Sequence, residues 1–521
     1  MRSNQTSPPS DTGDPHQSRP VPRRWGWRTP GGGRAAHVEP GVRYSATTSQ
    51  LCGLFPFATS SGASVHGVPI GRHMHTAEPV GLDPAEWLRS GLVSNTGVWV
   101  QGQPGIGKSS ITKRMLVGLV GYGMTAIIPG DIKGEYTPLI TALGGSVWRI
   151  GRGLHSLNPL DAGALTSALD QATGTDRHRL HETIRARRLS LLEALIIIVR
   201  RAEITVTERR LLGAALDTAC GPLDSGPGGP QPVIPDVLNV LMTGAGPLQR
   251  IAATLDDPGY RQDTRDLVNT LGLLCEGAIR GMFDRQSTVS ADPGSPALSL
   301  DISALDDDDD DVVAAAMLCS WAWTAGHIDA TRTLGHRRNV VQVQDELRRA
   351  LRVAPGLVER SDRITRLNRH RGVVSFQVTH SLDDLEALPT EADRAKARGL
   401  AARNGILLLG GMADKELDGL RRIVPLTSGE GSLITSWAAP PTWHAGRAHP
   451  GRGKYLIKSG ERMGLPVALT LTATEQRLYD TDQAFYHPVA EGGGAEHSCD
   501  DGRPPLGPTR PRRARRPTVR R

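Results

Sequence analysis

The chain has 521 residues, of which 38% are hydrophobic and 4% aromatic. This composition supports a sizeable core of aliphatic side chains, and the length suggests roughly two to four domains. Five scattered cysteines without a CxxC pair argue against a disulfide framework and a zinc site. An apolar signal segment and a run of about 18 apolar residues are both lacking, so we expect a cytoplasmic protein that reaches a membrane only through partners.

Positive charge is concentrated at the two ends of the chain. Residues 1–45 carry seven Arg and three acidic residues, and residues 503–521 carry eight Arg and no acidic residue. Because the formal net charge is +7, the stretch between them is mildly acidic, near −5. The ends are rich in Pro and Gly, which predicts disorder over 1–45 and 488–521. We expect the basic tail to bind polyanions, DNA included, without sequence preference.

Between these ends, strands alternate with helices in two regions. The first region is predicted to contain strands at 97–101, 124–129 and 147–150, with a helix from the end of the first to about residue 120. The second is predicted to contain strands at 339–344, 373–378 and 406–409. Strands separated by helices predict an α/β fold with a parallel sheet that is covered on both faces.

The intervening region is mainly helical. Apolar residues recur with a period near 3.6 over 180–201, 207–219, 234–242, 262–280 and 312–325. Residues 297–302 alternate like a strand and are expected to return the chain to the sheet.

A glycine-rich motif of the form GxxxxGK[ST] follows the first strand and opens a helix. Backbone N–H groups of such a loop surround phosphates, the lysine supplies a charge to the outer phosphates, and the hydroxyl after it binds Mg²⁺. The motif predicts a P-loop that binds ATP and Mg²⁺, with Lys108 also acting in catalysis and Ser109 as a metal ligand. The nucleotide-binding residues are predicted to be Gly102, Gln103, Pro104, Gly105, Ile106, Gly107, Lys108, Ser109 and Ser110.

A pair of carboxylates follows the predicted strand 339–344. Asp345 is a candidate for holding Mg²⁺ through water, and Glu346 for orienting the attacking water. Gln342 and Gln344 interrupt this strand, although a buried parallel strand is usually apolar throughout. The alternative is that the pair only supplies acidic charge at the N-terminus of the next helix.

The predicted strand 373–378 leads to His380, which is either a sensor that donates a hydrogen bond to the γ-phosphate or a polar strand end. Four arginines precede this strand, at positions 363, 366, 369 and 371, and one of them could reach the nucleotide of a neighbouring subunit. For any single arginine, the alternative is a solvated basic helix end.

Several segments occur together in one order: LFPF at 54–57, the P-loop, DIKGEY at 131–136, Gly144-Gly145 and LNPLD at 157–161. With GAIRGMFD at 277–284 and GKYLIK at 453–458, this order resembles the conjugation and type IV secretion ATPases (TraG/TraC-like) of the FtsK–HerA superfamily. The resemblance covers roughly residues 50–485.

The resemblance implies a RecA-like, ring-forming motor that is docked on membrane-embedded channel proteins, active as a homo-hexamer. It places Asp345-Glu346 at the Walker B pair and His380, where the family usually carries Gln, at the sensor. Arg369 is the nearest match to the interfacial arginine of the family. The domains implied are a disordered segment 1–45, a first core part 46–161, a helical insertion 162–330, a second core part 331–487 and a basic tail 488–521.

The expected function is therefore an ATP-hydrolysing motor for conjugative transfer or type IV-like secretion of DNA or protein. One alternative is a DNA-binding translocase of the FtsK or coupling-protein kind, which grips DNA directly. Another is an assembly factor that binds ATP without turning it over.

Overall fold

The computed structural model describes residues 66–163, 165–221, 231–244, 246–254, 256–292, 294–305, 308–335, 338–351, 371–381, 388, 390–438, 449 and 451–479. The segments predicted to be disordered, 1–45 and 488–521, lie outside these residues, as does Arg369. Within the described residues, no helix combines the length and the apolar character that crossing a bilayer requires.

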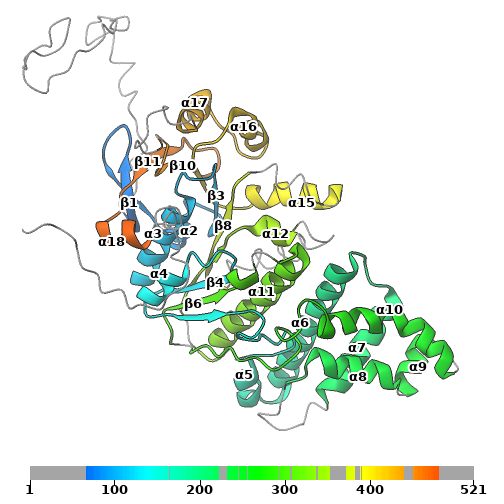
Figure 1. The fold of residues 1–521 in the computed structure, drawn as a ribbon. Coiled ribbons are helices and arrows are strands. Elements are labelled where there is room, and N and C mark those ends of the chain that lie inside the picture. Colours follow the sequence, from blue (N-terminus) through cyan, green and yellow to red (C-terminus); the bar gives the residue numbers. More distant parts are fainter. Residues whose placement is uncertain are drawn as a thin grey trace, which may run out of the picture. The chain divides into compact units, whose positions relative to one another are not determined.

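The described part of the chain is organised around one eleven-stranded sheet (Figure 1), with the strand order β2-β1-β11-β10-β9-β3-β8-β7-β4-β6-β5. The strands are β1 (Val68–His73), β2 (Pro79–Leu82), β3 (Gly97–Gln101), β4 (Thr125–Asp131), β5 (Ser146–Arg149), β6 (Ala297–Asp301), β7 (Val340–Gln344), β8 (Val373–Thr379), β9 (Ile406–Leu409), β10 (Lys454–Lys458) and β11 (Leu465–Leu469).

Helices connect most of these strands. They are α2 (Pro84–Arg89), α3 (Lys108–Gly121), α4 (Thr137–Ala142), α5 (Leu165–Gln171), α6 (Gly174–Arg200), α7 (Val206–Cys220), α8 (Ile234–Thr243), α9 (Gly246–Ala252), α10 (Asp257–Glu276), α11 (Asp310–Thr333), α12 (Leu347–Leu351), α15 (Glu391–Ala402), α16 (Asp414–Arg421), α17 (Ser428–Trp437) and α18 (Ala473–Leu478).

The sheet has a parallel part and an antiparallel edge. The seven strands from β9 to β5 in the sheet order pair in parallel, which confirms the predicted α/β class and all six strands of the two alternating regions, together with the returning strand β6. Strands β1, β2, β10 and β11 extend the sheet by antiparallel pairing. These four strands were not predicted from the sequence.

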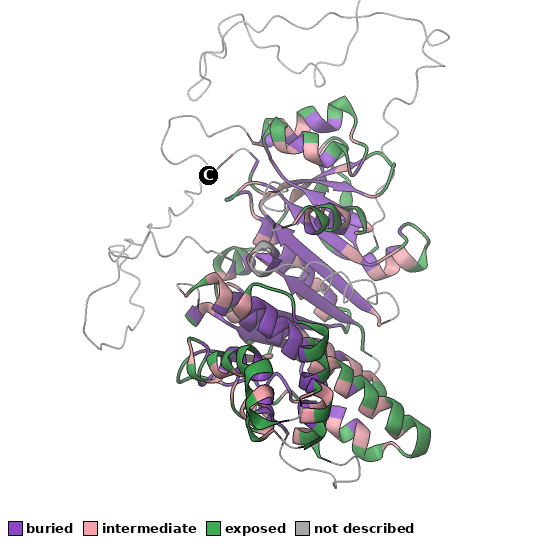
Figure 2. Cartoon of the chain, turned by 90° about the vertical axis from the view of Figure 1, so that its right-hand side faces the viewer, coloured by how far each residue is buried: buried purple, intermediate pink, exposed green. Residues whose placement is uncertain are grey.

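Two apolar layers cover the parallel part from opposite faces. Val98 and Val100 of β3 point toward Ile111 and Met115 of α3. Trp99, between the two valines, belongs to the other layer, where Met317 of α11 lies against β4. Figure 2 shows the strands as a buried layer between more exposed helices. This alternation follows because side chains along a strand point to opposite faces with a period of two, and both faces of the sheet are covered.

The helical region α5–α10 is inserted between β5 and β6 and lies beyond α11 in Figure 1. Its inner faces share one continuous apolar core with the α11 face of the sheet, since Leu195 of α6, Leu211 of α7 and Leu271 of α10 belong to the same cluster as Leu300 of β6. Helix α7 begins with a complete capping box, in which the side chains of Thr205 and Glu208 bond each other's backbone N–H. Shared burial therefore ties this region to the sheet.

The glutamines of β7 are buried together with other polar side chains. Gln377 of β8 lies opposite Gln344, and its Nε2 donates to Gln344 Oε1 at 3.4 Å. Asn404 Nδ2 in turn donates to Gln377 Oε1 at 3.0 Å. Val341 and Val343 point to the α3 face instead. Strand β7 is therefore polar on one face and still buried, and the neighbouring strand supplies a hydrogen bond to Gln344 Oε1.

Candidate nucleotide-binding site

The predicted P-loop connects the end of β3 to the start of α3. Gly105 and Gly107 have φ angles of 80° and 98°, in the left-handed region that favours glycine. A Cβ on Gly107 would also lie 2.9 Å from Tyr455 Oη, so a side chain there has no room. Helix α3 then begins at Lys108, and its first turn contains Ser109 and Ser110, which are both half-buried. The backbone thus directs a helix N-terminus at the loop, an arrangement that binds anions.

Residues far away in sequence hold this loop. Tyr455 Oη of β10 donates to Gly107 O at 2.6 Å, and Gly453 N donates to Ile106 O at 2.9 Å. On the other side, Gln103 N donates to Gly411 O at 3.0 Å. Tyr455 was not predicted as a site residue, although it belongs to the segment 453–458 of the family resemblance. These bonds fix the loop. Among the described residues, the N–H groups of Gly105 and Gly107 donate to no protein acceptor.

Lys108 is buried, and its ammonium group contacts only neutral partners. Its Nζ donates to Gly102 O at 2.8 Å and to Gln103 O at 3.2 Å, and it lies 2.9 Å from His380 Nδ1. Burial lowers its pKa to about 8. No carboxylate of the described residues forms an ion pair with Lys108, so its charge is uncompensated at short range. A buried cation next to a loop of free N–H groups fits a phosphate chain.

The carboxylate pair lies at the end of β7. Asp345 is half-buried, and its Oδ2 accepts from Tyr136 Oη at 2.9 Å. Burial and the charge of Glu346 raise the pKa of Asp345. Glu346 follows with a φ of 50°, which a residue with a side chain rarely adopts. Such local strain persists where the surroundings impose it, and it is common at functional sites.

Two donors hold the Glu346 carboxylate. Its Oε1 lies 2.8 Å from Lys133 Nζ and 2.9 Å from His380 Nε2. Burial by itself raises the pKa of Glu346, but the hydrogen bonds from His380 and Lys133 outweigh burial and bring the pKa well below its usual range. Lys133 is half-exposed and was missed as a site residue, although it belongs to the segment 131–136 of the resemblance.

His380 joins the two halves of the site. It follows β8, and its ring bridges Lys108 through Nδ1 and Glu346 through Nε2. A neutral imidazole with its proton on Nε2 satisfies both contacts, since Nδ1 then accepts from the ammonium and Nε2–H donates to the carboxylate. The structure therefore brings together Lys108, Asp345–Glu346 and His380, from three strand ends that the sequence separates widely.

A further acidic and basic pair lies behind these residues. Asp131, at the end of β4, accepts from Tyr136 N at 2.8 Å, and burial raises its pKa to about 7. Lys113 of α3 is buried, its Nζ has no hydrogen-bond partner, and it lies 5.5 Å from the ring centroid of Tyr136. Among the described residues, no group of three or more His, Cys, Asp or Glu side chains could hold a metal ion. A Mg²⁺ ion at this site would therefore depend on phosphate oxygens and water in addition to Ser109 and Asp345.

Comparison with known proteins gives fold neighbours only. No protein family matches the sequence, and no curated protein resembles it closely enough to be matched. Among solved structures, VirB4 of Thermoanaerobacter pseudethanolicus superposes with a TM-score of 0.61 at 19% identity, over 80% of this chain and 98% of that one. The plasmid coupling protein TrwB, in complex with ADP and Mg²⁺, covers 77% of this chain and 90% of its own at 12% identity and a TM-score of 0.46. The likeness to VirB4 confirms the fold of a P-loop ATPase.

Proposed function

We propose that this chain binds ATP with Mg²⁺ and hydrolyses it to energise conjugative transfer or type IV-like secretion. The observation that carries this proposal is the bridge of His380 between Lys108 and Glu346, with contacts of 2.9 Å on both sides. It couples the phosphate-binding loop to the carboxylate that is suited to orient water. The likeness of the fold to VirB4 supports the same assignment.

The residues have distinct roles in this proposal. Lys108 and the loop N–H groups bind the outer phosphates, Ser109 and Asp345 hold Mg²⁺, and Glu346 orients the attacking water. When bound, ATP with Mg²⁺ supplies a transferable phosphoryl group whose developing charge the metal neutralises.

In the structure Lys108 and Glu346 are each engaged by protein partners. Phosphate binding therefore requires Lys108 to exchange its contact with His380 for one to the ligand. That exchange removes the contact between Lys108 and His380 Nδ1, so the His380 ring can change its position when a phosphate binds. Such a change suits a sensor.

The test is nucleotide binding and hydrolysis by the full chain with Mg²⁺, measured with and without DNA. We expect micromolar ATP binding and slow basal hydrolysis, both of which require Mg²⁺. A chain that binds ATP and never turns it over supports the assembly-factor alternative instead.

We further propose that the active form is a homo-hexamer docked on membrane-embedded channel proteins, with Arg369 reaching the nucleotide of the neighbouring subunit. Arg369→Ala should slow hydrolysis and leave ATP affinity nearly unchanged. Mixing this variant with Glu346→Gln subunits should restore part of the activity, because one intact composite site forms between them. A rate per chain that is constant at every concentration and in every mixture contradicts this arrangement.

Removal of the basic tail distinguishes the proposed motor from the alternative, a translocase that grips DNA directly. We expect truncation after Tyr486 to remove most low-salt DNA binding and to change basal hydrolysis little, because eight arginines leave with the tail. If the truncated chain still binds DNA, and DNA still stimulates its hydrolysis, the body itself grips DNA.

A further inference from the structure

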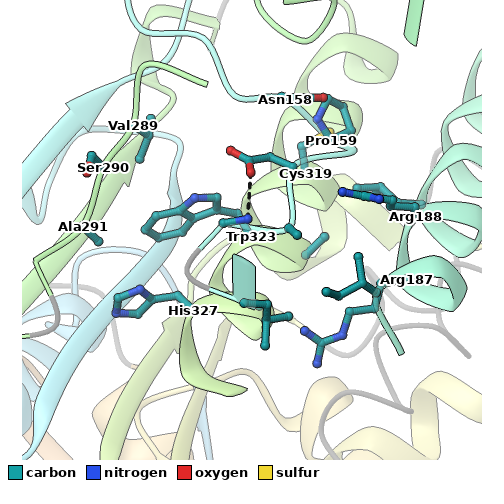
Figure 3. A pocket seen from close by; sticks show the side chains of 18 of the residues that line it. Asn158, Pro159, Arg187, Arg188, Val289, Ser290, Ala291, Cys319, Trp323 and His327 are labelled. Carbon is teal, nitrogen blue, oxygen red and sulfur yellow. Dashed lines mark hydrogen bonds between the residues drawn. The ribbon is translucent and has the colours of Figure 1, made fainter. Parts of the chain in front are cut away.

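A cavity of about 340 Å³ lies between the loop that follows β5, helix α6 and helix α11 (Figure 3). None of its described lining residues belongs to the P-loop or to the ends of β7 and β8. Protein interiors are close-packed, with few voids larger than a water molecule, whereas small-molecule sites begin at about 300 Å³. The size of this hollow is therefore that of a ligand site.

Arg187 of α6 brings an incompletely paired cation to the cavity. Its Nη2 pairs with Asp329 of α11, but its Nη1 is buried without a hydrogen-bond partner. The same Asp329 carboxylate also receives Arg371 Nη2, at 3.3 Å. One carboxylate thus serves two guanidinium groups, which leaves a local excess of positive charge.

The electrostatics of Arg187 reflect this shortage of acceptors. Burial, together with the nearby charge of Arg371, lowers the pKa of Arg187 to about 10. A buried donor without an acceptor costs free energy, more so when the group is charged. An anion in the cavity would supply both the missing acceptor and the missing charge.

Other polar groups of the cavity do not meet this need. Asp161, a lining residue, uses its Oδ1 to accept from Gly163 N within its own loop, at 2.7 Å. Each guanidinium nitrogen of the neighbouring Arg188 has a hydrogen-bond partner, since Nε donates to Leu160 O, Nη2 to Gln231 Oε1 and Nη1 to Cys220 Sγ. Arg187 is therefore the group toward which a ligand anion would be directed.

The opposite wall is aromatic and uncharged. Trp323 stacks on His327 with ring centroids 5.4 Å apart and planes 7° from parallel, and Trp148 meets Trp323 edge-on at 5.8 Å. Burial lowers the pKa of His327, so its imidazole is neutral near pH 7. Figure 3 shows Trp323 and His327 of α11 across the hollow from Arg187. Such a wall suits a flat apolar ring.

We propose that this cavity binds a small organic anion with a flat aromatic body, whose anionic group meets Arg187 Nη1 and whose ring lies along Trp323. The site is separate from the proposed nucleotide site, and its test does not depend on ATP hydrolysis.

The probes for the experiment are 1-naphthoate and 1-naphthamide, which share a ring and a size and differ in charge. Calorimetric titration of the full chain should show naphthoate binding about tenfold more tightly than naphthamide, or better, because only the anion completes Arg187. Equal affinities, or no binding of naphthoate, would overturn the proposal.

Variants locate the site. Arg187→Met keeps the apolar stem and should reduce naphthoate affinity to that of naphthamide. Arg185→Met, on the same helix, is the matched control, because Arg185 pairs with Asp217 outside the cavity and should leave the affinity ratio unchanged. Unchanged naphthoate binding in Arg187→Met contradicts the assignment.

Ala322→Phe keeps the proposal testable even if Arg187→Met does not fold. Ala322 lines the cavity, so a phenyl group there should fill it and abolish the binding of both probes. If a folded Ala322→Phe variant binds naphthoate as the wild type does, the probe lies elsewhere and the proposal fails.

Discussion

Two buried lysine–glutamate arrangements lie at different parts of the sheet, and they are built in opposite ways. At the antiparallel edge, Lys458 Nζ contacts both carboxylate oxygens of Glu430, at 2.9 and 3.2 Å, and Gly464 N donates to the same carboxylate at 2.6 Å. At the ends of the parallel strands, Lys108 and Glu346 do not touch in this way but are joined through His380.

The difference separates a structural pair from a reactive one. Lys458 and Glu430 compensate each other's charge directly, and Gly464 N and Thr427 N complete the hydrogen bonds of the carboxylate. Lys108 bonds neutral carbonyls and an imidazole, each of which is a weaker partner for an ammonium than a carboxylate or a phosphate. Charges that are joined through a histidine ring can exchange partners when a ligand arrives, whereas a direct buried pair resists exchange.

The largest effect should come from removing the lysine of the reactive arrangement. Lys108→Ala deletes the buried ammonium of the P-loop, so ATP hydrolysis should fall about 10²-fold or more. Phosphate release assays on the folded variant measure this, with circular dichroism as the control for structure. Hydrolysis at the wild-type rate would falsify the assignment of the P-loop.

Glu346→Gln should separate binding from turnover. The amide retains the shape and an oxygen that can accept from Lys133 and His380, so ATP should still bind, while hydrolysis should fall about 10²-fold because the carboxylate that orients water is lost. Binding and single-turnover rates are measured on the same preparation. If turnover stays normal, the catalytic carboxylate lies elsewhere, with Asp131 or Glu135 next to be replaced.

The structural pair should show the reverse pattern. Lys458→Met leaves Glu430 buried with a charge and without its cation, so the free energy of unfolding should fall by about 3–5 kcal/mol while ATP affinity stays unchanged. Urea unfolding measures the loss. The double variant Lys458→Met with Glu430→Gln should recover part of it, because no unpaired charge is left. A matching loss of ATP affinity would show that the two regions are not independent.

The smallest expected effect is the uptake of a fraction of a proton when ATP binds. Lys108 has a pKa of about 8 without ligand, and phosphate favours its charged form, so ATP binding raises that pKa. ATP binding at pH 8.5 should therefore take up protons, and affinity should fall as pH rises from about 7.5 to 9. Calorimetry in buffers of different ionisation enthalpy measures this proton uptake. The Glu346→Gln variant should show the same uptake, because Lys108 is unchanged. Proton release on ATP binding would contradict this prediction.

Much of this arrangement can be predicted from local sequence. The GxxxxGK[ST] spacing predicts the loop and helix α3, because glycine alone adopts the φ angles of Gly105 and Gly107 without strain. Apolar runs predict most of the parallel strands, since strands buried on both faces are usually rich in apolar residues. The antiparallel edge was not predicted. Strands β1 and β2 pair across a short connection, as do β10 and β11, but β1 joins the sheet through β11, which lies at the far end of the described chain.

By itself the sequence determined the glycine-rich loop before α3, the parallel core and the position of the carboxylate pair after β7, because each depends on residues that are close along the chain. Only the tertiary structure decided that His380 lies between Lys108 and Glu346, that Lys133 pairs with Glu346, and that Tyr455 holds Gly107 from 348 positions away. It also decided that Gln344 of β7 is buried with an amide partner, and that Arg187 lines a cavity. These contacts arise from the order in which strands join the sheet, which no local pattern encodes.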